Sequence, residues 1–184
     1  LRHGLRLSMH PGQYTVLNAP DSGVVERAIA DLAYHCDFLD ALGLDGQHKI
    51  VLHIGGAYGD KATATRRFVE RCRSLEARLL ERLVIENDDK VYNVEEVLKI
   101  SEITGLPTVF DNLHHAVNGS PTLRSEAEWI AACGETWREK DGAQKIHYSQ
   151  QAAGKRPGAH SETIRVAEFL SFLRSLQKNA DRPD

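Results

Sequence analysis

The sequence lacks the basic excess and the long apolar runs that mark several large protein classes. Its 184 residues carry 23 lysines and arginines against 26 aspartates and glutamates, a net charge of −3. A broad basic surface for nucleic acids is therefore not indicated, and any affinity for DNA needs a local positive field, which bound divalent ions would supply. No apolar run approaches the ~18 residues of a membrane span, and no secretion leader stands at the start, so we expect no membrane partner.

Cysteine is also scarce, with three residues far apart in the chain: Cys36, Cys72 and Cys133. Each falls on an apolar helical face, so we expect buried free thiols in a reducing compartment and neither a disulfide nor a thiolate metal site. The chain begins with Leu1 and already reads into a strand, so we expect its true start to lie upstream.

Short β-branched segments alternate with helical ones along the whole chain. The expected strands are residues 5–10, 49–54, 83–86, 107–111 and 145–148, and the expected helices are residues 22–42, 61–80, 94–104, 123–139 and 161–177. Such strands are typical of a parallel sheet that is buried on both faces. Five βα units in a row predict a single α/β domain over residues 1–184, either an open doubly wound sheet or a closed barrel.

Each expected strand ends in a residue type that binds metals: His10, His53, Glu86, Asp111 and His147. Taken singly, each has an ordinary explanation, as a loop histidine or a helix N-cap carboxylate. However, the carboxyl ends of parallel barrel strands meet at one face, where active sites gather. The five side chains together therefore predict one metal site, which His114 and His160 in the following loops extend.

Mixed imidazole and carboxylate ligands favour zinc, manganese or iron over magnesium and calcium, which prefer oxygen ligands. Seven ligands are too many for one ion and predict two or three ions, with Glu86 bridging a pair. Clustered divalent ions are typical of phosphoester hydrolysis.

Two loops beside the expected site have unusual composition. Residues 55–61 (GGAYGDK) either hold a phosphate on backbone N–H groups, with Lys61 contacting the substrate, or form a tight turn that leaves Lys61 on the surface. They have neither the P-loop nor the dinucleotide spacing, so no nucleotide cofactor is expected. Residues 10–14 (HPGQY) place Gln13 and Tyr14 where an amide and a ring either stack on bases or cap an edge of the core.

Six blocks of the sequence resemble the UV damage endonucleases, in that family's order and over nearly the whole chain. They are HPGQY, LHIGGAYGDK, IENDD, PTVFDNLHH, KIH and GAHS, at residues 10–14, 52–61, 85–89, 107–115, 145–147 and 158–161. The resemblance implies a TIM (β/α)8-type barrel similar to endonuclease IV and xylose isomerase. This chain would be a partial barrel of about five βα units, without the N-terminal strands and the last strand, which carries a metal-binding glutamate in the family.

The resemblance also implies an activity, the incision of DNA on the 5′ side of cyclobutane dimers and 6-4 photoproducts. Its implied metal ligands are His10, His53, Glu86, Asp111, His114, His147 and His160. Glu86, Asp111 and His147 would be catalytic together with Lys145, which is either modified or in contact with phosphate, while Gln13 and Tyr14 would probe the lesion. The expected cofactor is manganese, with zinc, magnesium or cobalt as alternatives. The expected partner is damaged double-stranded DNA. The protein is expected to be a monomer in the cytoplasm, associated with the nucleoid if it is bacterial.

Three other functions stay open at this point. An abasic-site endonuclease would share the metals and the reaction, and a sugar isomerase or epimerase would use the same barrel for a small polyol. A non-catalytic binding module is the third, because a barrel without its outer strands has open sheet edges and lacks a ligand.

Overall fold

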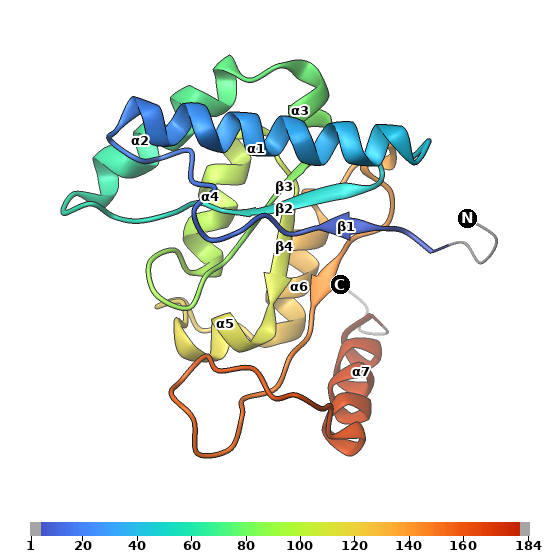
Figure 1. The fold of residues 1–184 in the computed structure, drawn as a ribbon. Helices are drawn as coiled ribbons and strands as arrows, with labels where there is room; N and C mark the ends of the chain where they lie inside the picture. Colours follow the sequence, from blue (N-terminus) through green and yellow to red (C-terminus); the bar gives the residue numbers. More distant parts are fainter. Residues whose placement is uncertain (1–4, 181–184) are drawn as a thin grey trace.

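Five parallel strands form a half-barrel that organises the molecule (Figure 1). The computed structural model describes residues 5–180, and within them the strands pair in the order of the chain. They are β1 (Ser8–Met9), β2 (Lys49–His53), β3 (Leu83–Glu86), β4 (Thr108–Asp111) and β5 (Ile146–His147). Every neighbouring pair is parallel, so all five carboxyl ends lie at one end of the sheet.

Helices connect the strands and pack along the sheet (Figure 1). They are α1 (Ser22–Ala41), α2 (Lys61–Ser74), α3 (Ala77–Arg82), α4 (Val94–Thr104), α5 (Asn112–Val117), α6 (Glu126–Gly134) and α7 (Val166–Ala180), with a 3-10 turn, η1, at Glu139–Asp141. Side-chain caps begin several of them: Asp21 caps α1, Asp60 caps α2 and Asn93 caps α4. Each cap satisfies a free N–H group of the first helical turn, so these sequence positions fix where the helices start.

The central strands are buried on both faces, as barrel strands are. Ile50 and Leu52 of β2 belong to the large core that the helices cover, together with Leu83 and Ile85 of β3. The residues between them point the other way, and Val51 packs in a separate inner cluster with Val84, Val109 and Trp137. This alternation confirms the parallel sheet predicted from the β-branched segments.

Two expected helices are shorter than predicted. The helix expected at 61–80 is broken at Leu75, whose backbone is extended with ψ 150°, and this break separates α2 from α3. The helix expected at 161–177 begins only at Val166. Apolar spacing continues through both interruptions, which is why the periodicity alone does not reveal them.

The segment after β4 and the segment before β5 also differ from the prediction. Residues 112–117, expected to be irregular, form the short helix α5, because the Asp111 carboxylate accepts the N–H of His114 and caps it. The helix expected at 123–139 is α6 followed by a separate 3-10 turn. The first strand is limited to two residues of the expected range 5–10.

The three cysteines are buried free thiols, as predicted. Among the helices of residues 5–180, none combines the length and the apolarity that crossing a bilayer requires.

Candidate metal centre

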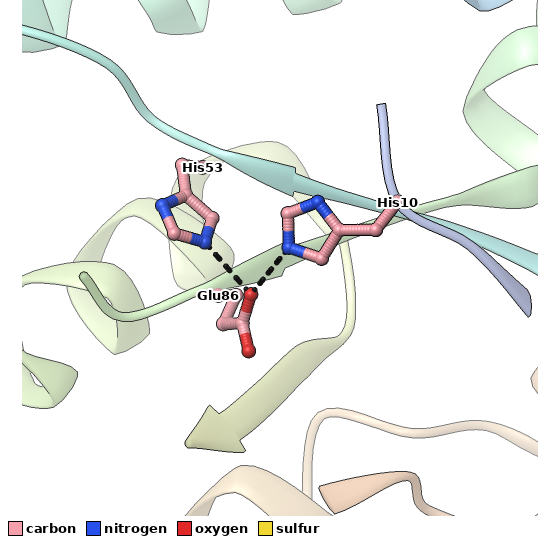
Figure 2. A group of neighbouring side chains, drawn as sticks. All are labelled: His10, His53 and Glu86. Carbon is pink, nitrogen blue, oxygen red and sulfur yellow. Dashed lines mark hydrogen bonds and ion pairs between the residues drawn. The ribbon is translucent and has the colours of Figure 1, made fainter. Parts of the chain in front are cut away.

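Glu86, the last residue of β3, lies at the centre of a cluster of imidazoles (Figure 2). Its side chain is buried, and one carboxylate oxygen accepts hydrogen bonds from His10 Nε2 at 2.9 Å and His53 Nε2 at 2.8 Å. The other oxygen accepts from His147 Nδ1. His10 follows β1, His53 ends β2 and His147 ends β5. The carboxyl ends of three strands thus meet on a carboxylate that a fourth strand supplies.

Asp111 adds a second buried carboxylate. The candidate ligand atoms fall into two groups, His10 with His53 and Glu86, and Glu86 with Asp111 and His147, and within each group they lie no more than 4.8 Å apart. Glu86 is common to both groups, so ions held by the two groups would share it as a ligand. Burial, and secondarily the charge of Glu86, raise the pKa of the Asp111 carboxyl. The two carboxylates therefore repel each other, and a bound divalent cation would offset this repulsion.

The pKa values of Glu86 and His10 reflect the same contacts. Burial alone would raise the pKa of Glu86, but hydrogen bonds from His10, His147 and His53 outweigh it and hold the pKa well below its ordinary value. The hydrogen bond to Glu86 raises the pKa of His10, against the opposing effect of burial. The carboxylate is therefore ionised and available as a ligand at neutral pH.

The ring nitrogens of two histidines show how well a cation fits. His10 Nδ1 faces the Pro11 carbonyl at 3.2 Å while its Nε2 faces Glu86, so both nitrogens point at acceptors. A neutral imidazole has one N–H, so this geometry requires either an imidazolium or a cation beside Nε2. His114 Nδ1 lies 2.8 Å from the Asn87 carbonyl, which fixes Nδ1 as the donor and leaves Nε2 free, as in metal-ligating histidines. The donor set is consistent with divalent metal ions.

Five of the seven predicted ligands come together in the two groups, and the other two lie beside them. The ring of His114 is 5.3 Å from that of His53, measured between centroids, and the ring of His160 is 6.2 Å from that of His114. His160 is exposed, on the loop between β5 and α7. His114 and His160 thus extend a chain of imidazoles away from Glu86 without joining its hydrogen bonds.

The cluster opens into a groove of about 1280 Å³, whose lining includes the residues expected to probe a lesion. Gln13 and Tyr14 both lie on the loop after β1, and the side chain of Tyr14 is 81% exposed. The ring is therefore free to contact a molecule in the groove, and capping a core edge is not its role in this structure.

The two predicted lysines have different surroundings. Lys145 precedes β5, and its Nζ donates a hydrogen bond to Ser8 Oγ on β1 at 2.5 Å. Burial and the charge of Arg6 lower the pKa of Lys145, while Glu86 acts in the opposite direction. The ammonium of Lys61 pairs with Glu96 at 2.5 Å and does not line the groove, so its contact with substrate stays a prediction.

The glycine-rich loop before α2 is a tight turn packed against the loop after β1. Gly55 has φ 110°, and a Cβ there would lie 2.3 Å from Asn18 Oδ1. The Asn18 amide donates to the Gly56 carbonyl at 2.7 Å. These contacts explain why the position requires glycine, and phosphate binding by the loop stays a prediction.

Two asparagines that the sequence analysis did not single out align the strand ends. The Asn87 amide donates to the Asp111 carbonyl at 3.0 Å and accepts the Asp111 N–H at 2.9 Å. Asn112 makes the same pair of bonds with Ser149, at 3.0 and 2.8 Å. Each amide extends the hydrogen-bond ladder past the end of its strand. A signal was present, since each asparagine directly follows a candidate ligand, Glu86 or Asp111.

Replacing Asn87 with alanine is expected to weaken divalent metal binding roughly 10–100-fold, the usual cost of losing an outer-shell partner. The change leaves the buried main chain of Asp111 without two hydrogen bonds. Calorimetric titration with Mn²⁺ measures the loss. Ser101→Ala is the matched control. Ser101 lies on α4, and the change removes its buried hydrogen bond to the Leu106 carbonyl without affecting any candidate ligand. Equal metal affinities in the two variants would contradict a positioning role for Asn87.

The half-barrel and the side chains at its carboxyl ends define the class, a TIM-barrel protein with a candidate divalent metal centre. The chain belongs to the UV-endonuclease UvdE family, whose model matches residues 1–181. It is 42% identical over 175 residues to the UV DNA damage endonuclease of Clostridium perfringens (strain 13 / Type A), covering 95% of this chain and 42% of that protein. It is 35% identical to the Bacillus pumilus (strain SAFR-032) protein of the same name, covering 96% and 55%. The chain thus spans about half the length of these relatives.

Solved structures agree with this assignment. The crystal structure of SacUVDE matches with a TM-score of 0.87 and 40% identity, over 94% of this chain and 57% of that one. Endonuclease IV from Thermus thermophilus matches with a TM-score of 0.57 at 17% identity, over 88% and 60%. The second likeness concerns the fold alone, and together they confirm the predicted TIM-barrel class.

Proposed function

We propose that this chain forms the metal-binding part of an endonuclease that incises double-stranded DNA on the 5′ side of UV photoproducts. One observation carries the proposal: in a chain of the UvdE family, Glu86 joins two groups of candidate ligands beside a groove lined by Gln13 and Tyr14. The name of the Clostridium perfringens relative supports the same substrate.

The ions would be held by two sets of side chains that share Glu86, with His114 and His160 beside them. Bound divalent ions would supply the Lewis acidity that phosphodiester hydrolysis needs, toward water and toward the phosphoryl oxygens. Manganese is the proposed ion, because the donors mix imidazole with carboxylate. The half-buried ammonium of Lys145, close enough to Glu86 for its pKa to be affected, would attract a phosphate.

Gln13 and Tyr14 would distinguish damaged from undamaged DNA. A photoproduct weakens base stacking, so extruding damaged bases costs less than extruding normal ones. An exposed aromatic ring and an amide on one loop suit stacking on bases and filling the gap that they leave. In this proposal selectivity depends on the deformation of the duplex and not on reading base edges.

A labelled duplex with a single cyclobutane dimer tests the proposal directly. We expect incision 5′ to the dimer with Mn²⁺, none with EDTA, and a rate at least 100-fold lower for the His53→Ala protein, consistent with loss of metal-ion catalysis. Tyr14→Ala is the comparison variant, expected to bind the metal normally while losing preference for the dimer.

Parallel duplexes separate the rival functions. Preferential cutting at an abasic site would indicate an endonuclease IV-like enzyme, and turnover of a ketohexose without incision would indicate an epimerase. Metal and DNA binding without any turnover would indicate a binding module. Each of these results would overturn the proposed activity.

A further inference from the structure

The groove that contains the candidate metal centre is lined by three basic side chains: Arg27, Lys90 and Arg156. Within residues 5–180, none of the three has an ion pair or a side-chain hydrogen bond. Several basic residues elsewhere in the described chain are engaged in ion pairs. Arg78 pairs with Asp37 and Arg82 with Asp40. Each of the three cations is therefore free to pair with an anionic ligand in the groove.

Two of the acidic side chains in the same lining are occupied by donors of the protein. Asp31 accepts the hydroxyl hydrogen of Thr15 at 2.5 Å. Asp88 accepts the backbone N–H groups of Lys90, Val91 and Tyr92 at 2.5–3.0 Å. Asp89 lies beside Gly158. The carboxylate of Asp31 thus joins α1 to the loop after β1, that of Asp88 closes a local turn, and neither forms an ion pair with the three basic side chains.

The main chain beneath each basic residue is fixed. Arg27 is in the second turn of α1, and Lys90 is on the turn that Asp88 closes. Arg156 is on the loop after β5, which the Gln151 amide closes. Its Nε2 donates to the Arg156 carbonyl at 2.9 Å and its Oε1 accepts the Gly158 N–H at 2.8 Å. Such preorganisation lowers the cost of holding a ligand.

The three positions span the sheet from one edge to the other. Arg27 follows β1, Lys90 follows β3 and Arg156 follows β5, while β1 and β5 are the two edge strands of the described sheet. A ligand that met all three would contact segments that follow three different strands. A DNA duplex offers several phosphates for such contacts, because they repeat along both of its strands.

We propose that Arg27, Lys90 and Arg156 bind backbone phosphates of the DNA, with Gln151 as the residue that positions Arg156. The inference rests on the proposed function, because it takes DNA as the occupant of the groove. Contacts of this kind orient a duplex over a reactive centre without reading its sequence. They would supply paired cations for the phosphates in a chain whose net charge is −3.

The salt dependence of DNA binding tests the proposal. The triple variant Arg27→Gln, Lys90→Gln, Arg156→Gln is compared with Arg73→Gln, Lys140→Gln, Arg174→Gln, which removes the same charges at exposed positions outside the groove. Binding of undamaged and dimer-containing duplexes is measured by fluorescence anisotropy in EDTA from about 50 to about 200 mM salt. Each lost phosphate contact lowers the slope of log K against log salt by about 0.9.

We expect the groove triple to lose about 2.7 from the slope, so that the affinity lost over this fourfold rise in salt shrinks about 40-fold. The control triple should keep the wild-type slope, and both duplexes should be affected equally. Equal changes in the two triples, or an unchanged slope in the groove triple, would overturn the assignment.

Gln151 needs a test of its own. Gln151→Ala should lower the slope by about 0.9, as Arg156→Gln does, and the double variant should lower it no further. Additive losses would show that Gln151 does not act through Arg156. A wild-type protein that binds DNA with the expected slope but does not incise dimers would refute the proposed activity alone. Normal incision with no role for the three cations would refute this inference alone.

Discussion

The Glu86→Gln protein is expected to lose divalent metal binding almost completely. Glutamine matches glutamate in size but removes the charge that both ligand groups share, and its NH2 group cannot ligate. The affinity for Mn²⁺ should fall by more than the roughly 10–100-fold that loss of a supporting residue costs. No other carboxylate of the described residues belongs to both groups, so none can replace it.

Thermal unfolding with and without Mn²⁺ measures this loss independently of catalysis. A metal that binds only the folded state adds about 2.7 kcal/mol of stability at a concentration of about 100 Kd. The wild-type protein should show that gain and lose it on addition of EDTA, whereas Glu86→Gln should unfold at the same temperature with and without metal. Asp89→Asn, which changes a nearby carboxylate outside both groups, should behave like the wild type. A metal-dependent gain that survives in Glu86→Gln would exclude Glu86 as the shared ligand.

The five residues of the two candidate ligand groups could be predicted from the sequence, because they lie at the ends of strands. His53, Glu86, Asp111 and His147 each end a strand, and His10 follows one directly. In a parallel sheet that placement is enough to bring them together. The position of His160 does not follow from a strand end, because it lies on a long loop whose path depends on the Gln151 amide.

Other features depended on contacts that the periodicity of the sequence does not encode. The break between α2 and α3 and the start of α5 each result from one local event, the extended Leu75 and the capping carboxylate of Asp111. Arg27, Lys90 and Arg156 are free for a ligand because no carboxylate of the described chain pairs with them. Only the folded structure shows which charged side chains lie close enough to pair. The net charge of −3 therefore concealed a local arrangement of basic side chains.

Polar contacts also join the strands inside the half-barrel, far from the groove. Lys49, at the start of β2, is 1% exposed, and its ammonium lies 2.6 Å from the Asp141 carboxylate and 2.6 Å from the Glu81 carbonyl. Burial lowers the pKa of Lys49, and the hydrogen bond from Lys49 to Asp141 opposes that shift. Asp141 ends the 3-10 turn before β5. The ion pair therefore ties β2 to the segment that leads into β5.

Breaking this ion pair is expected to be strongly destabilising. Asp141→Asn would leave a buried ammonium without its counter-charge, which typically costs about 3–5 kcal/mol, whereas Lys49→Met with Asp141→Leu should be close to neutral. Chemical denaturation of Asp141→Asn, Lys49→Met and the double variant measures the free energy of unfolding of each protein. The comparison distinguishes the cost of leaving one charge unpaired from the cost of removing both. If Asp141→Asn and the double variant lost equal stability, packing and not charge would be the cause.

The pH dependence of Asp141→Asn has a definite sign. Because the pKa of Lys49 is lowered in the folded protein, the unfolded chain holds this proton over a pH interval where the folded protein does not. Stability should therefore rise as the pH increases through the folded pKa toward the ordinary value for lysine, and over a wider pH interval when asparagine replaces Asp141. The same pair links the start of β2 to the turn before β5, and these two strands carry His53 and His147 at their other ends. Mn²⁺ affinity should thus fall in Asp141→Asn and recover in the apolar double variant, because the ligands need the two strands at a fixed distance and not the charges between them.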